Sequence, residues 1–107
     1  MKNILVTGGA GYIGSHTCKL LHKKNYNICV FDNLTTGCEE FCKYGTFFKG
    51  NVTDKKDLGN CFEQFKPDII IHFAALAHVD ESIYHPDEYY RVNVIGTINI
   101  LDTMYKF

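Results

Sequence analysis

The chain has 107 residues, of which 46% are hydrophobic and 21% are charged, and its formal net charge is -1. This composition is typical of one soluble globular domain and excludes a collagen-like or disordered chain. The apolar runs fall well short of the roughly 20 residues that cross a bilayer, and no basic cluster is present. We therefore expect a cytoplasmic protein that binds a small molecule and neither a membrane nor a nucleic acid.

The number and spacing of the cysteines argue against disulfides. The count is odd, no Cys-x-x-Cys pair occurs, and most of the five lie in apolar segments, which favours reduced thiols. Two of them are four residues apart, but no second Cys or His pair follows at the spacing of a zinc site, so we expect no metal. The five are Cys18, Cys29, Cys38, Cys42 and Cys61.

Short β-branched runs alternate with longer amphipathic stretches, which is typical of parallel strands joined by crossover helices. Strands are predicted at residues 4–6, 28–31, 46–49 and 69–73. Helices are predicted at 12–24, at 54–65 with Thr53 or Asp54 as N-cap and Pro67 beyond the end, and from about Asp87 to the last residue. In this last helix Tyr90, Val94, Ile98 and Leu101 recur at helical spacing. Residues 74–86 are expected to form a loop.

A glycine-rich motif follows the first strand and opens the first helix, where residues 7–16 read TGGAGYIGSH. Two spacings fit it, Gly9-x-Gly11-x-x-Gly14 and Gly8-x-x-Gly11-x-x-Gly14. In dinucleotide sites one glycine makes the turn, another lets the backbone approach the pyrophosphate, and a third lets helix and strand pack closely. The helix N-terminus then faces the phosphates.

An acidic residue at the end of the second strand supports this interpretation. Asp32 lies 18 positions beyond Gly14, where a carboxylate accepts hydrogen bonds from the adenosine ribose. Asn33 follows it in place of an arginine that could pair with a 2′-phosphate, so NAD is predicted over NADP. The alternative is a glycine-rich turn that ends in a solvated aspartate.

These observations predict an α/β fold, the N-terminal part of a doubly wound, parallel-sheet Rossmann fold. An open doubly wound sheet has two halves, whereas about four strands are present here and the chain stops within a predicted helix. We therefore expect residues 1–107 to be an NAD-binding domain that is truncated within a longer protein. The sheet edge beyond the fourth strand would be unpaired, so stability in isolation is in question.

Further motifs stand in a fixed order along the rest of the chain. They are DNL at 32–34, IHFAAL at 71–76, ES at 81–82, Pro86, YY at 89–90 and NVxGT at 93–97. With residues 7–16 they resemble the N-terminal third of the extended short-chain dehydrogenase/reductase family, and within it the UDP-sugar 4-epimerases. The resemblance covers essentially the whole chain.

The resemblance implies a bound NAD and a set of residues around it. Tyr12 and Ile13 would lie over the pyrophosphate, residues 32–34 would hold the adenosine ribose, residues 51–52 would flank the adenine, and residues 73–75 would line the nicotinamide half. The implied cofactor-binding residues are Gly8, Gly11, Tyr12, Ile13, Gly14, Asp32, Asn33, Leu34, Asn51, Val52, Phe73, Ala74, Ala75 and Asn93.

Several of these residues also have ordinary structural explanations. The two alanines could be a close-packed strand end, Phe73 could belong to the core, and Asn93 could be a residue on a helix surface rather than one that pins a helix start or a loop. His72 lies in an apolar strand, which favours a satisfied core histidine over a base. Asp80 and Glu81 are adjacent loop carboxylates, which are more often solvated than catalytic.

The chain departs from the family at two positions. The family has an aspartate where Asn51 stands, and we expect the amide oxygen of Asn51 to accept from the adenine amino group instead. Many 4-epimerases have a cofactor-contacting lysine where this chain has Ala77, followed by His78, so the side chain that makes that contact is missing here.

By resemblance, the intact protein interconverts UDP-glucose and UDP-galactose through a 4-keto sugar and forms a homodimer, to which the helix from about Asp87 contributes. A Tyr-x-x-x-Lys base motif is absent from these 107 residues, and in relatives it comes later. The expectation is therefore that no catalytic residue lies in this chain. A nucleotide-sugar 4,6-dehydratase, which residues 78–82 also resemble, a non-catalytic NAD-binding module and a chain that does not fold alone stay open as alternatives.

Overall fold

The computed structural model describes residues 1–34, 37, 39–76 and 79–107. Its strands are β1 (Asn3–Thr7), β2 (Asn27–Asp32), β3 (Thr46–Lys49) and β4 (Ile69–His72). Its helices are α1 (Tyr12–Lys23), α2 (Lys55–Phe65), α3 (Val79–Tyr84), α4 (Pro86–Tyr90) and α5 (Gly96–Lys106), with a 3-10 turn at Glu39–Phe41 and a π-helical segment, η2, at Arg91–Ile95.

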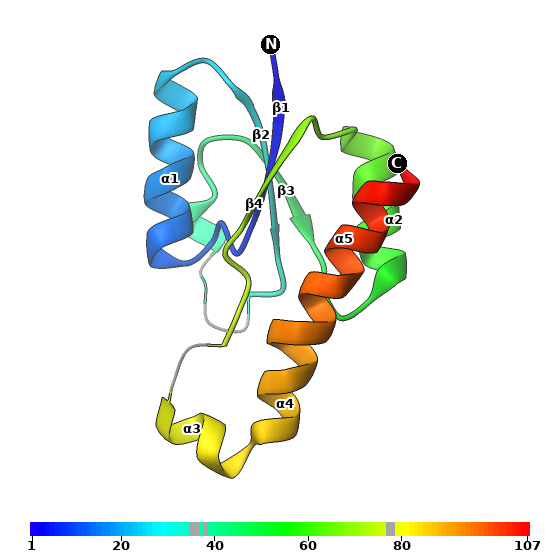
Figure 1. Ribbon diagram of the computed structural model, residues 1–107. Helices are drawn as coiled ribbons and strands as arrows, with labels where there is room; N and C mark the ends of the chain where they lie inside the picture. Colours follow the sequence, from blue (N-terminus) through cyan, green and yellow to red (C-terminus); the bar gives the residue numbers. More distant parts are fainter. Residues whose placement is uncertain (35–36, 38, 77–78) are drawn as a thin grey trace.

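The four strands form one parallel sheet in the order β3-β2-β1-β4. In the register of the central strand, Leu5 pairs with Cys29 on one side and with Ile70 on the other. Helix α1 covers one face of the sheet, while α2 and α5 lie side by side on the other (Figure 1). The predicted α/β architecture is therefore confirmed, because this is half of a doubly wound sheet with helices on both faces.

Alternate side chains along the strands supply two hydrophobic clusters, one on each face. Ile4 and Val6 of β1 pack with residues of α1, whereas Leu5 packs with residues of α2 and α5. The inner strands are almost continuously buried, as expected for a parallel sheet that is covered on both faces. The α2–α5 cluster consists of Leu5, Cys29, Phe31, Val52, Leu58, Cys61, Phe62 and Ile100.

The ends of α2 follow from local sequence. The Asp54 carboxylate accepts a hydrogen bond of 2.9 Å from the backbone N–H of Lys56, so Asp54 is the N-cap. At the other end Lys66 takes a left-handed conformation with φ of 54°, and Pro67 follows. Both predicted signals are confirmed.

The segment after β4 differs from its prediction. Residues 74–86 were expected to form a loop, but they contain the six-residue helix α3, whose sequence shows no apolar periodicity that predicts a helix. The expected long helix is present as α4, η2 and α5, with a π-helical segment in its middle. Its apolar stripe lies on the surface, since Tyr90, Val94, Ile98 and Leu101 are all exposed.

Two other expectations concern thiols and membranes. Cys18, Cys29, Cys42 and Cys61 form no disulfide among the described residues, and burial raises the pKa of the Cys18 thiol to about 11. Cys38 lies outside the described residues.

Over the described part of the chain, none of the helices combines the length and the apolar character that a membrane span requires.

Candidate functional site

A cleft of about 370 Å³ lies at the carboxyl ends of the strands. It is bordered by the glycine-rich loop after β1, by the segments that follow β2, β3 and β4, and by α4 and η2. Helices α3 and α4 extend beyond this end of the sheet (Figure 1). The lining residues are Gly8, Gly11, Phe31, Asp32, Asn33, Gly50, Asn51, Val52, Phe73, Ala74, Ala75, Leu76, Glu88, Arg91 and Val92.

Three glycines of the loop have three different environments. Gly8 has a φ of 71°, and a Cβ there would lie 2.7 Å from the backbone nitrogen of Ala74. A Cβ on Gly14 would overlap the backbone oxygen of Gly8. A Cβ on Gly11 would meet nothing closer than that same oxygen, at an ordinary 3.4 Å. The protein therefore requires glycine at positions 8 and 14, whereas at position 11 a Cβ would make only an ordinary contact.

The N-terminus of α1 adds a positive potential to this open side. Gly11 is the N-cap and makes no side-chain capping bond, and the first turn contains no acidic residue. Unpaired N–H groups and the helix dipole attract anions at such an end. Tyr12 and Ile13 of this turn are exposed.

Asp32 is nearly buried and organises the loop. One carboxylate oxygen accepts from the backbone N–H of Ala10 at 3.0 Å, and the other accepts from that of Leu34 at 2.7 Å. Leu34 has a φ of 63°, so the turn is held in a left-handed conformation. Each carboxylate oxygen has a second lone pair, which leaves acceptors available toward the cleft.

His72 joins the ends of β4 and α5 through both ring nitrogens. The Thr97 hydroxyl donates to the Asn93 carbonyl at 2.7 Å, so it can only accept from Nε2–H of His72, 3.2 Å away. Nδ1 is then the unprotonated nitrogen and accepts from the Thr7 hydroxyl at 2.5 Å. Burial lowers the pKa of His72. The prediction that His72 is satisfied by hydrogen bonds is confirmed, although the residue is half-buried at the end of β4 and lies outside the two hydrophobic clusters.

The same Thr7 hydroxyl fixes the backbone that leaves β4. Its oxygen accepts from the backbone N–H groups of Phe73 and Ala74 at 3.1 and 3.3 Å. Asn93 holds the next part of this segment, accepting from Leu76 N–H at 2.8 Å and donating to its carbonyl at 2.9 Å. Residues 73–76 therefore line the cleft in a fixed path.

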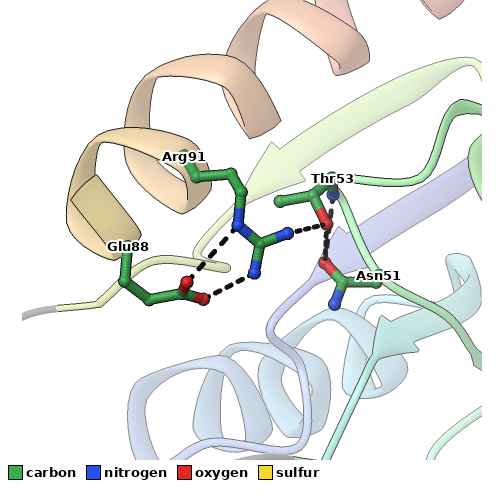
Figure 2. A network of polar contacts seen from close by, with 4 residues as sticks. All are labelled: Asn51, Thr53, Glu88 and Arg91. Atoms are coloured by element: carbon green, nitrogen blue, oxygen red, sulfur yellow. Dashed lines mark hydrogen bonds and ion pairs between the residues drawn. The ribbon is translucent and has the colours of Figure 1, made fainter.

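A polar network joins Asn51 and Thr53, which follow β3, to Glu88 and Arg91 at the border of the cleft (Figure 2). The Asn51 side-chain oxygen accepts from both the backbone N–H and the hydroxyl of Thr53, at 3.0 and 2.8 Å. Arg91 donates to the Thr53 hydroxyl at 3.2 Å and to the Glu88 carboxylate at 2.6 Å. In this arrangement the Asn51 oxygen is engaged by two donors of Thr53, whereas the expected bond to an adenine amino group stays a prediction.

Nine of the fourteen predicted residues line the cleft together. Gly14 lies beneath the loop, Tyr12 and Ile13 are at the exposed helix start, Leu34 contributes its backbone, and Asn93 acts through Leu76. Asp80 and Glu81 are exposed. Ala77 and His78 lie outside the described residues. Glu88 and Arg91 were not predicted to border the cleft. Their spacing of three residues on a predicted helix was a signal for an ion pair between them.

Comparison with known proteins extends these observations. Residues 4–107 match the model of the NAD dependent epimerase/dehydratase family. The UDP-glucose 4-epimerase of Rhizobium meliloti (strain 1021) is 50% identical over 100 residues, which cover 94% of this chain and 30% of that protein. The chain thus spans about a third of the length of the curated relatives it matches.

Solved structures of similar proteins have the same fold. The UDP-glucose 4-epimerase from Brucella ovis in complex with NAD gives a TM-score of 0.93 at 47% identity, over 96% of this chain and 32% of that one. The Thermotoga maritima UDP-glucose 4-epimerase with UDP-glucose gives 0.93 at 35% identity, over 97% and 34%. From the family match over nearly its whole length, this chain belongs to the NAD dependent epimerase/dehydratase family.

Proposed function

We propose that residues 1–107 are the NAD-binding part of a UDP-sugar 4-epimerase that interconverts UDP-glucose and UDP-galactose. The observation that carries this proposal is the environment of Gly11. The fold has no steric need for glycine there, yet the position borders the cleft at the uncapped start of α1. A ligand that approaches the backbone closely and carries negative charge accounts for both features.

The residues around the cleft fit a dinucleotide. Gly11 and the start of α1 would meet the pyrophosphate, and the free lone pairs of Asp32 would accept from ribose hydroxyls. Residues 51–52 would border the adenine, and the fixed backbone of residues 73–75 would border the nicotinamide half. When bound, NAD supplies reversible oxidation of the carbon that carries the sugar's 4-hydroxyl.

Charge favours NAD over NADP in this cleft. A 2′-phosphate near Asp32 would meet a carboxylate of the same sign. Arg91 also borders the cleft, but its guanidinium is paired with Glu88, 2.6 Å away, which offsets its charge. We therefore propose that the dinucleotide carries a free 2′-hydroxyl.

We propose that this chain binds NAD without turning over substrate. His72 ends β4 next to the cleft-lining Phe73, and both of its ring nitrogens are hydrogen-bonded to threonine hydroxyls. No Tyr-x-x-x-Lys motif occurs in the sequence to supply a tyrosine base. A UDP-galactose conversion assay on the 107-residue chain is expected to give no product above background.

The test of binding is a calorimetric titration with NAD, in which Gly11→Ala is compared with Gly59→Ala. A Cβ on Gly59, in α2, would meet nothing within 4 Å, so this matched control adds the same methyl group away from the cleft. Gly11→Ala is expected to weaken NAD binding at least about tenfold with little change in melting temperature. Equal affinity in the two variants would rule out the assignment of Gly11 to the pyrophosphate.

The substrate and assembly of the whole protein are also proposals. The relatives reported above are named 4-epimerases, which favours a UDP-sugar 4-epimerase over a 4,6-dehydratase of the same family. The exposed stripe of α4, η2 and α5 supports a homodimer, because contiguous apolar side chains on a surface mark interaction sites. Free thiols in the described residues are consistent with a cytoplasmic location.

A further inference from the structure

We propose that Asn51 presents hydrogen-bond donors to the 6-position of the purine ring, so that this cleft accepts a 6-oxo purine dinucleotide at least as well as adenine. This inference rests on the proposed NAD site and concerns which base that site selects. Its basis is the network of Asn51, Thr53, Glu88 and Arg91 (Figure 2).

The first step is the orientation of the Asn51 amide. The backbone N–H of Thr53 can only donate, and it lies 3.0 Å from the Asn51 side chain, so the atom that faces it must be the carbonyl oxygen. The side-chain nitrogen therefore points the other way. Figure 2 shows Nδ2 directed away from Thr53.

The second step is the direction of the Thr53 hydroxyl. Arg91 has only donors, so the contact of 3.2 Å makes the Thr53 oxygen an acceptor from the guanidinium. The hydroxyl proton is then directed to Asn51, whose oxygen lies 2.8 Å away. Glu88 holds Arg91 in place by accepting from Nη2 and Nε. Arg91 thus donates in two directions, to Glu88 and through Thr53 to Asn51, and such connected hydrogen bonds strengthen one another.

The third step places Asn51 where the base would lie. Asp32 ends β2 and pairs with Lys49 at the end of the neighbouring strand β3. The next residue, Gly50, donates its N–H to the Asp32 carbonyl at 3.1 Å, and Asn51 follows it at the wall of the cleft. A nucleoside whose ribose reaches the Asp32 carboxylate would therefore direct its base toward Asn51.

The chemistry of the 6-position then decides the preference. Adenine carries an amino group there, which is a donor, whereas hypoxanthine carries a carbonyl oxygen, which is an acceptor. The NH₂ group of Asn51 matches the carbonyl and opposes the amino group. An aspartate at position 51 would accept both hydrogen bonds from Thr53 with one carboxylate oxygen. Its other oxygen, an acceptor, would take the place of the Asn51 Nδ2 donor.

The experiment is a calorimetric titration of the full chain with NAD and with nicotinamide hypoxanthine dinucleotide. The wild-type chain is expected to bind the hypoxanthine form at least as tightly as NAD. Asn51→Asp should shift the ratio of the two dissociation constants about tenfold or more toward NAD, because the polarity of the facing group is inverted. Asn60→Asp, which adds the same charge at an exposed position of α2 outside the cleft, should leave the ratio unchanged.

A second pair of variants tests the role of Thr53. Thr53→Val removes the hydroxyl but keeps the backbone N–H that orients the Asn51 amide, so this variant and Thr53→Ser are both expected to keep the wild-type ratio. A wild-type chain that prefers NAD about tenfold or more, or an Asn51→Asp ratio that does not move, would overturn the inference. Failure of the wild-type chain to bind either dinucleotide would instead reject the proposed NAD site, and the inference with it.

Discussion

Asp32 combines a structural task with a proposed ligand contact, and its two oxygens hold different parts of the chain. Asp32 has 8% of its surface exposed. One of its carboxylate oxygens accepts a hydrogen bond from the backbone N–H of Ala10, and the other accepts one from that of Leu34. Motif spacing predicted that an acid stands here. It could not predict that the same acid fixes the glycine loop, because that contact joins residues 22 positions apart.

Replacing Asp32 with asparagine should lower the stability of the fold. The amide has one acceptor oxygen, so either Ala10 N–H or Leu34 N–H would face an NH₂ group, at a cost of about 1–3 kcal/mol in the free energy of unfolding. Urea denaturation measures this loss. Asp102→Asn is the control, since it removes an exposed ion pair with Lys55 at 3.2 Å and should cost less than about 1 kcal/mol. Equal losses in the two variants would contradict the prediction.

His72 should make stability depend on pH. Burial lowers its pKa below the ordinary value of 6.5, so as the pH falls below about 6.5 the unfolded chain takes up a proton before the folded chain does. The free energy of unfolding should therefore rise with pH through this window and lose its His72 contribution in acid. Urea midpoints between pH 5 and 8 should show a shallower slope for His72→Gln than for wild type; parallel curves would contradict the assignment.

At the scale of elements, the π-helical segment connects the C-terminal helix to both borders of the cleft. Arg91 reaches the loop before α2, and Asn93 reaches the segment after β4. Periodicity predicted a helix over these residues but not its π-helical turn, because a helix pattern carries no signal for one wider turn. The short α3 escaped prediction since six residues cannot display an amphipathic period.

Asn93→Ala should loosen the segment after β4 without unfolding the sheet. It removes the two hydrogen bonds that hold Leu76, each of which contributes about 0.5–1.5 kcal/mol. Amide exchange at Leu76 should therefore become faster, while exchange at Val30 in β2 serves as an internal reference and should change little. Unaltered protection at Leu76 would show that Asn93 does not hold this segment.

At the scale of the whole molecule, the exposed stripe of Tyr90, Val94, Ile98 and Leu101 predicts self-association. Sedimentation velocity should find a dimer of the wild-type chain and a monomer of Ile98→Glu, because a buried unpaired charge opposes association. Ile83→Glu makes the same change in α3, at another exposed isoleucine outside the stripe, and should remain dimeric. A monomeric wild-type chain would remove the support for this interface.

The parallel sheet with crossover helices was predictable from the sequence, whereas the wall of the cleft formed by Asn51, Glu88 and Arg91 was not. Alternating strands and helices with a glycine-rich first turn restrict the topology to few choices. The contact between Arg91 and Thr53 joins residues 38 positions apart in the chain and forms only after folding. Local patterns carry no information about such a contact.

The position of β1 in the sheet has a consequence for the order of folding. This strand is synthesised first, but its two neighbours arrive at different times: β2 follows 24 residues later, whereas β4 follows 65 residues later. During synthesis the β1–α1–β2 unit can assemble early, while the other edge of β1, with Leu5 and Val6, stays open until β4 has emerged. An apolar, unpaired edge is a site of aggregation. The nascent chain is therefore most vulnerable between residues 32 and 69, and a chaperone that covers β1 in that interval should raise its folding yield.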